Sequence, residues 1–124
     1  MGIKGIGVDV VDVTRMKHML RDQGEAFTAK VFTEAEIAYC RSKKNPYEHF
    51  AARFAAKEAV SKALQTGWRG EFRWKDVEVM NEPSGAPKIA LYGSLAKTLE
   101  GKIVHLSLSH TEHTVVAFAL IEDS

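Results

Sequence analysis

The sequence predicts an α+β fold in which a largely antiparallel sheet packs against one long central helix. Residues rich in Val and Ile form short segments near both ends of the chain, the strongest helix signals lie between them, and only four residues separate the last two predicted strands. Such a hairpin, combined with helices gathered elsewhere in the chain, is typical of the α+β class. The 124 residues show no linker and no internal repeat, so we expect one domain over 1–124.

The first predicted element is a strand over 3–11, where β-branched residues are close to continuous, as in a buried strand. Asp12 or Thr14 can cap a short helix that ends near Leu20. A polar turn over 21–24 follows.

Two further helices are predicted from their start signals. Thr33 and Glu36 form a Thr-x-x-Glu capping box that opens a helix over 34–43. Asn45, followed by proline, is a stronger start and opens the main helix over 46–65, which a glycine-containing loop ends.

Strands dominate the rest of the chain. Alternating apolar residues over 72–79 predict a strand whose phase slips near Asp76, as at a bulge. The remaining predicted elements are a turn over 82–87, a strand over 88–91, a helix over 93–100 capped by Gly93 or Ser94, and a hairpin of strands 103–109 and 114–121.

Composition excludes several classes of protein. The 17 basic and 16 acidic residues nearly balance, so the chain lacks the basic excess of a nucleic-acid binder. The single Cys40 excludes an internal disulfide and a multi-cysteine zinc site, which agrees with a reducing compartment. The start lacks a signal-peptide core, and no apolar run reaches the roughly 18 residues of a membrane span. We therefore expect a cytoplasmic protein without nucleic-acid or membrane partners.

The main helix carries acid and base among alanines. Glu58 and Lys62 stand one turn apart, and Ala51, Ala55 and Ala59 beside them are small enough to leave room for a ligand. The simpler interpretation is a surface Glu–Lys pair worth roughly 0.2–0.5 kcal/mol.

Asp9 lies within the apolar first strand, where a buried carboxylate must be paired, hydrogen-bonded or metal-bound. Together with Glu58 it could offer two oxygen ligands to Mg²⁺, which commonly takes only one or two carboxylates. This requires the first strand and the main helix to pack together.

Other polar residues carry weaker signals. Ser109 and His110 are adjacent on a strand and point to opposite faces, so a hydrolase triad is rejected. His110 fits either a hairpin residue or a group for anion binding or proton transfer. Arg53, Lys57 and Lys62 could hold phosphates, and Gly85 with Pro87 could let backbone approach a flat ligand, although ordinary surface roles explain each one singly.

Three ordered segments together resemble the holo-[acyl-carrier-protein] synthases, the short phosphopantetheinyl transferases. They are Gly5–Val11, Arg53–Ala59 with Lys62, and Ser107–His110. The resemblance extends over nearly the whole chain, and it implies a 4′-phosphopantetheinyl transferase-like fold. The segment 65–68 departs from the usual Gly-Thr-Gly of the family.

The resemblance implies transfer of 4′-phosphopantetheine from coenzyme A to a serine of an apo acyl carrier protein, with release of adenosine 3′,5′-bisphosphate. Asp9 and Glu58 match the carboxylates that bind Mg²⁺, and Lys62 matches a lysine near the pyrophosphate; these three are the expected catalytic residues. The serine proton goes to Glu58, Asp9 or metal-bound water in preference to His110. A non-catalytic carrier-protein-binding module and a nucleotide-binding regulatory protein are the alternatives.

The resemblance also implies where the substrates bind. Arg53 and His110 match residues around the coenzyme A phosphates, and Gly85 with Pro87 matches a loop near the nucleotide. The family implies a homotrimer with sites between subunits, and because Arg53 lies ~140° around the helix from Glu58, the two are expected on different walls of such a site. A basic helix should face the acidic carrier protein, through Arg15, Lys17 and Arg21.

Overall fold

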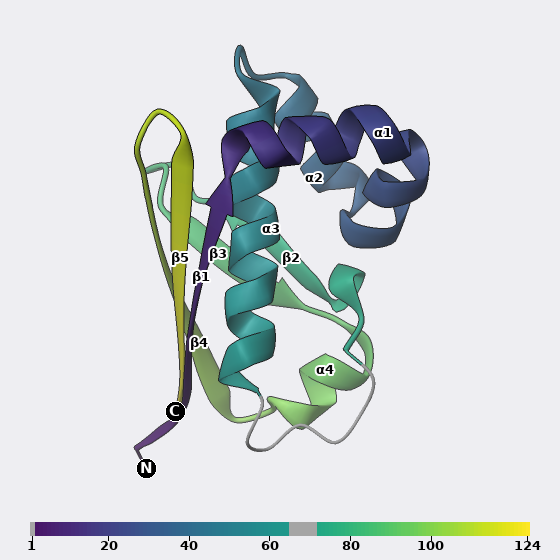
Figure 1. The fold of residues 1–124 in the computed structure, drawn as a ribbon. Helices are drawn as coiled ribbons and strands as arrows, with labels where there is room; N and C mark the ends of the chain where they lie inside the picture. The colour runs from purple at the N-terminus through teal and green to yellow at the C-terminus, as the bar shows by residue number, and fades with distance from the viewer. Residues whose placement is uncertain (1, 65–71) are drawn as a thin grey trace.

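The computed structural model describes residues 2–64 and 72–124, and Figure 1 shows one long helix standing beside an antiparallel sheet. In chain order the elements are β1 (Ile3–Asp12), α1 (Val13–Val31), α2 (Glu34–Arg41), α3 (Pro46–Ala63), the 3₁₀ turn η1 (Trp74–Asp76), β2 (Val77–Asn81), β3 (Pro87–Leu91), α4 (Gly93–Thr98), β4 (Lys102–His110) and β5 (Thr114–Asp123). The predicted α+β class is confirmed.

All strand pairs of the described chain are antiparallel and form two sheets. One sheet has the order β1-β5-β4, and the other is the β2-β3 hairpin. The predicted hairpin of the last two strands is confirmed, with both strands slightly longer than expected. Helix α3 packs on one face of the three-stranded sheet, mainly over β1 and β5 (Figure 1). This is the strand–helix packing that the two-carboxylate hypothesis required.

Glycines in β1 allow α3 to approach very closely. A Cβ atom added to Gly7 would lie 2.0 Å from the carbonyl oxygen of Ala59, and one added to Gly5 would lie 2.0 Å from that of Ala63. The alanines predicted to leave space for a ligand are fully buried instead: Ala51, Ala55 and Ala59. That interpretation was wrong, because fully buried side chains cannot line an open site, and the space beside Ala59 is occupied by β1 itself.

The two faces of β1 differ sharply, so the prediction of a strand buried on both faces was wrong for the single chain. Ile6, Val8 and Val10 are 59%, 52% and 61% exposed on the face that points away from α3. Val8 is paired in register with Phe118 of β5, which is 40% exposed. The outer face of the sheet is therefore an apolar surface that no element of the described chain covers.

Helix α1 is longer than the sequence predicted. It begins after Asp12, whose carboxylate accepts a hydrogen bond from the backbone N–H of Arg15 at 2.9 Å. It continues past the predicted end at Leu20 to Val31, with a break at Gly24, where φ is 56° and ψ is −135°. The predicted turn is thus a kink, because the second half buries Phe27 and Val31 in the core.

The capping predictions have different outcomes. The box formed by Thr33 and Glu36 is present and opens α2. Within the described chain the Asn45 side chain makes no capping hydrogen bond, although α3 does begin at Pro46.

The predicted strand over 72–79 was wrong in its first half. Trp74 lies in η1, and β2 begins only at Val77. The indole stacks on Phe54 of α3 at 5.3 Å between ring centroids, and this packing outweighs the alternating pattern. The predicted end of the central helix at 65 and the glycine loop after it lie outside the described residues. Within 2–64 and 72–124, no helix is long and apolar enough to cross a membrane.

Candidate active site

Asp9, Glu58 and Lys62 lie together where β1 crosses α3. The Lys62 ammonium donates to Asp9 Oδ1 at 3.0 Å and to the backbone oxygen of Val8 at 3.2 Å. The Asp9 side chain is 15% exposed, and Asp9 and Glu58 line the same pocket of about 250 Å³. The structure therefore assembles the three residues that the sequence singled out from segments about fifty positions apart.

The two carboxylates repel each other. Partial burial raises the pKa of Glu58, the negative charge of Asp9 raises it further, and Lys62 acts in the opposite direction. A divalent cation between the two carboxylates would relieve this repulsion, so the donor set fits Mg²⁺. Among the described residues no group of three or more His, Cys, Asp or Glu is arranged to hold a metal. The remaining ligands of a metal here would come from water or substrate.

The pocket has further walls, and the sequence did not indicate such a position for two of its residues, Met19 and Phe54. Met19 of α1 and Phe54 of α3 supply an apolar side, and Asp12 and Arg15 supply polar groups. Arg15 was predicted to contact a carrier protein, and it lies at the edge of the same pocket as the carboxylates. The only signal in the sequence for the position of Phe54 is that it lies one helical turn before Glu58.

His110 lies at the other end of α3. Its Nδ1 is 3.6 Å from Glu48 Oε1, and Glu48 precedes Glu58 by ten residues, or about 15 Å of helix. A single chain therefore brings Asp9, Glu58 and Lys62 together but leaves His110 apart from them.

Arg53 is buried, with 3% of its surface exposed. Its Nη2 donates to Asn81 Oδ1 at 2.8 Å, and its guanidinium lies 4.2 Å from the centroid of the Tyr39 ring. Asn81 in turn donates to the carbonyl oxygen of Gly85 at 3.1 Å, so Arg53 is linked to the turn that holds Gly85 and Pro87. Nothing in the sequence pointed to Asn81.

The predicted basic surface lies on α1. Arg15, Lys17 and Arg21 are all exposed. Lys17 is over the Tyr47 ring at 5.4 Å, and Arg21 forms an ion pair with the neighbouring Asp22 at 3.1 Å.

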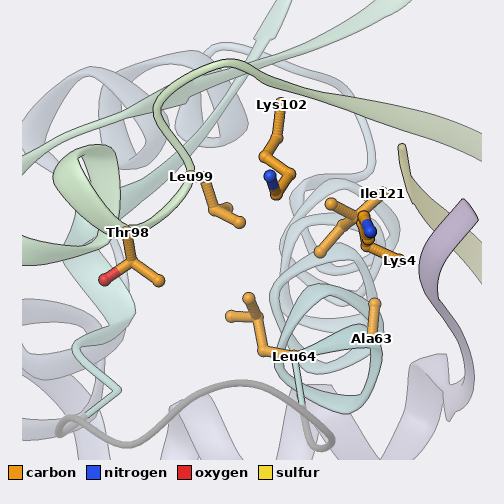
Figure 2. A pocket seen from close by; sticks show the side chains of 7 residues that line it. All are labelled: Lys4, Ala63, Leu64, Thr98, Leu99, Lys102 and Ile121. Atoms are coloured by element: carbon orange, nitrogen blue, oxygen red, sulfur yellow. The ribbon is translucent and has the colours of Figure 1, made fainter. Parts of the chain in front are cut away.

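A second pocket, of about 320 Å³, opens at the C-terminal end of α3, which is the end away from His110 (Figure 2). Its floor is apolar, and two lysines at its rim both pair with Asp123, Lys4 at 3.4 Å and Lys102 at 2.9 Å. It contains none of the predicted site residues. Its lining consists of Lys4, Ala63, Leu64, Thr98, Leu99, Lys102 and Ile121.

Comparison with known proteins gives consistent relatives. Residues 5–119 match the family described as the 4′-phosphopantetheinyl transferase superfamily. The holo-[acyl-carrier-protein] synthase of Koribacter versatilis is 47% identical over 124 residues, covering 98% of this chain and 99% of that protein.

Solved structures agree. The holo-[acyl-carrier-protein] synthase of Neisseria meningitidis superposes with a TM-score of 0.89 at 35% identity, covering 98% of this chain and all of the other. The enzyme of Bacillus anthracis, solved in complex with CoA (3′,5′-ADP), gives a TM-score of 0.82 at 36% identity, covering 98% of each chain. The chain therefore belongs to the 4′-phosphopantetheinyl transferase superfamily and, within it, to the holo-[acyl-carrier-protein] synthases.

Proposed function

We propose that this chain transfers 4′-phosphopantetheine from coenzyme A to a serine of an apo acyl carrier protein. The serine hydroxyl loses its proton to Glu58, Asp9 or water, its oxygen forms the new bond to phosphorus, the bridging P–O bond of the pyrophosphate breaks, and adenosine 3′,5′-bisphosphate leaves. The observation that carries the proposal is that Asp9 and Glu58 line one pocket while Lys62 donates to Asp9 at 3.0 Å. Phosphoryl transfer needs little covalent chemistry from the protein, and positioned charge is its main requirement.

Asp9 and Glu58 would hold Mg²⁺. When bound, the metal would neutralise pyrophosphate charge and polarise the reacting phosphoryl group. Lys62 adds a point charge beside the same site, and its contact with Asp9 fixes the direction of its ammonium. The mutual repulsion of the carboxylates supports this role, because two acids held together without a cation raise the pKa of one of them.

The residues predicted to bind the nucleotide form a second group. Gly85 and Pro87 would contact the nucleotide from the β2–β3 turn, and His110 would approach the coenzyme A phosphates. Arg53 is 3% exposed, which leaves little of its surface for direct phosphate contact. We infer that Arg53 affects the nucleotide-binding residues indirectly, through its hydrogen bond to Asn81 inside the fold.

A complete site needs a second copy of the chain, in a homotrimer. His110 lies beside Glu48, which is about 15 Å of helix away from Glu58, and this supports the trimer because one chain supplies only one half of the site. The outer face of the three-stranded sheet supports it too, since Ile6, Val8 and Val10 leave an apolar surface suited to burial between subunits. Full activity from a monomer, measured by sedimentation and assay at the same dilution, would contradict the trimer.

The exposed basic side of α1 would bind the acidic carrier protein. Arg15 lies at the rim of the pocket that holds Asp9 and Glu58, so a protein docked there would present its serine to that pocket. Opposite charges speed encounter and are screened by salt. The KM for carrier protein should therefore rise severalfold at roughly 0.5 M salt, where the screening length falls well below 10 Å. The reducing environment that Cys40 suits agrees with work in the cytoplasm.

The deciding experiment is mass spectrometry of apo carrier protein incubated with this chain, coenzyme A and Mg²⁺. We expect one phosphopantetheine mass increment on a serine, and none when the metal is chelated. Carrier protein of unchanged mass would refute transferase activity and leave a binding module as the function.

A further inference from the structure

Asn81 is the last residue of β2 and faces Pro87, the first residue of β3. Both the oxygen and the nitrogen of its side-chain amide form hydrogen bonds. The oxygen accepts from Arg53 Nη2 at 2.8 Å, and the nitrogen donates to the carbonyl oxygen of Gly85 at 3.1 Å. One amide thus connects a buried cation on α3 with the backbone of an exposed turn.

The turn needs such a connection because little else fixes its tip. Two backbone hydrogen bonds close it, from Glu82 N–H to Ala86 O at 2.9 Å and from Gly85 N–H to Glu82 O at 2.7 Å. Gly85 adopts a φ of 92°, and a Cβ atom there would meet nothing within 4 Å, so packing does not fix the Gly85 peptide. The bond from Asn81 restricts the Gly85 carbonyl in addition to the backbone hydrogen bonds, and it reduces the freedom of the turn before any ligand binds.

Stability alone is a poor explanation for Arg53 at this position. In the part of the chain that the structure describes, no carboxylate lies within ion-pair distance of its guanidinium, and its buried Nε has no hydrogen-bond partner. Burying a charge without a counter-ion costs free energy that an apolar side chain would not cost. The arrangement instead gives Asn81 one fixed orientation, because only its oxygen can accept from Arg53.

We propose that Asn81 is a positioning residue for the nucleotide of coenzyme A. Arg53 orients the Asn81 amide, the amide fixes the Gly85 carbonyl, and the turn then presents Gly85 and Pro87 in one conformation to the nucleotide. This rests on the proposed function, because it takes the turn to be a wall of the coenzyme A site.

The variant Asn81→Asp keeps one of the two hydrogen bonds of the amide and removes the other. The carboxylate keeps an acceptor for Arg53 but cannot donate to Gly85. Because Asn81 is exposed, we expect the thermal midpoint of the variant to stay close to that of the wild-type protein. The KM for coenzyme A should rise about fivefold to tenfold, the effect of losing one hydrogen bond, while kcat and the KM for carrier protein stay near wild-type values.

Two further variants complete the test. The double variant Asn81→Asp with Glu82→Gln keeps the net charge of the turn and should show the same rise in KM for coenzyme A. Ser84→Ala removes only a 3.4 Å contact to Ala86 N–H in the same turn and should leave that KM unchanged.

An unchanged KM for coenzyme A in Asn81→Asp would overturn the proposal. A parallel rise in both KM values with a lowered thermal midpoint would also overturn it, because that would show a purely structural role. If Asn81→Asp unfolds, Asn81→Ser, whose hydroxyl is too short to bridge both partners, answers the same question. Failure of the proposed function is distinguishable, since wild-type protein would then leave carrier protein unmodified at every coenzyme A concentration.

Discussion

Helix α3 supplies the lysine of two lysine–carboxylate pairs whose surroundings differ completely. Lys57 lies 2.8 Å from Glu36 with both side chains 0% exposed, whereas Lys62 lies 3.0 Å from Asp9 with side chains 44% and 15% exposed. We call Lys57 with Glu36 the closed pair; it lies where α2, α3 and β2 meet. We call Lys62 with Asp9 the open pair, because Asp9 lines the pocket that also holds Glu58.

The side chains of the closed pair make further hydrogen bonds in addition to their ion pair. Lys57 also donates to the carbonyl oxygens of Trp74 and Val77, and Glu36 also accepts from the backbone N–H groups of Thr33 and Val79. The lysine has an acceptor for each of its three donors, and both oxygens of the glutamate are bonded in a site that solvent does not reach, so neither group is available to a ligand. Full hydrogen bonding and zero exposure therefore mark Lys57 and Glu36 as a structural pair. Lys62 and Asp9 are partly exposed, and Asp9 also lies close enough to Glu58 to raise its pKa, so this pair can exchange partners for a substrate.

The largest effect should come from Glu58 beside the open pair. Glu58→Gln keeps the size of the side chain and removes one charge from the proposed metal site. We expect transfer activity to fall at least about 100-fold, because metal stabilisation of the transition state is worth several kcal/mol. The mass-spectrometric assay with purified carrier protein measures this loss.

The same variant tests the metal without an assay of activity. Added Mg²⁺ should raise the thermal midpoint of the wild-type protein, since a ligand that binds only the folded state stabilises it, and this increase should disappear in Glu58→Gln. Equal shifts in both proteins would show that the metal binds elsewhere. Carrier-protein binding that survives while transfer is lost would also exclude the binding-module alternative.

The next effect concerns stability and should come from the closed pair. Lys57→Met leaves the Glu36 carboxylate buried without its cation, which typically costs about 3–5 kcal/mol. Urea unfolding followed by circular dichroism measures the change in free energy of unfolding. Lys62→Met is the matched control on the same helix, and we expect it to cost less than about 1 kcal/mol, as for exposed pairs.

A double variant separates loss of the pair from loss of packing. Glu36→Gln combined with Lys57→Met removes both charges and keeps an acceptor at position 36 for the capping box, so it should recover a large part of the lost stability. If it is as unstable as Lys57→Met alone, the uncompensated charge is not the cause.

The difference between the pairs shows how much of the candidate site can be predicted from the sequence. Helical periodicity alone places Glu58 and Lys62 on one face, and their proximity to Asp9 was a hypothesis that the structure supports. Lys57 was counted with possible phosphate ligands, because a charged residue is normally exposed. Its burial depends on α2 packing against α3 so that Glu36 meets it. A single ion pair between two helices leaves no periodic signal in either of them.

The outer face of β1 shows a second limit. Ile6, Val8 and Val10 read as a buried strand, yet in the single chain they are exposed. Apolar sequence indicates that a surface is covered in the working protein, and it does not say whether the same chain or another copy covers it. The glycines Gly5 and Gly7 are likewise readable only once α3 is known to lie against them.

A smaller effect is expected from the strand that supports the open pair. Gly7→Ala would place a Cβ atom 2.0 Å from the Ala59 carbonyl oxygen, so β1 and α3 must move apart. Such overpacking typically costs 1–3 kcal/mol. It should also displace Asp9 relative to Glu58 and lower activity per folded molecule, while the buried pair on the opposite side of α3 stays intact.

Thermal unfolding and the activity of the folded fraction measure the two consequences. A variant with wild-type stability and activity would show that β1 and α3 tolerate the added methyl group, and that close packing does not set the geometry of the site.

The last prediction uses the thiol of Cys40 as a reporter of local opening around the closed pair. Cys40 is fully buried beside the closed pair, and burial raises the pKa of its thiol to about 12. At pH 8 the folded protein therefore holds almost no thiolate, whereas an unfolded cysteine with a pKa near 8.5 is roughly one quarter ionised. Because the folded state keeps this proton as the pH rises past the unfolded pKa, Cys40 lowers stability progressively above about pH 9.

Labelling of Cys40 by a thiol reagent at pH 8 should consequently follow opening of the fold around the closed pair. Lys57→Met should increase the labelling rate about tenfold for every 1.4 kcal/mol of stability that it loses, and Lys62→Met should leave it nearly unchanged. Equal acceleration by both variants would mean that the two pairs belong to one cooperative unit. Acceleration by Lys57→Met alone would show that the side of α3 that carries Lys62 can change without loosening the helices packed around Lys57.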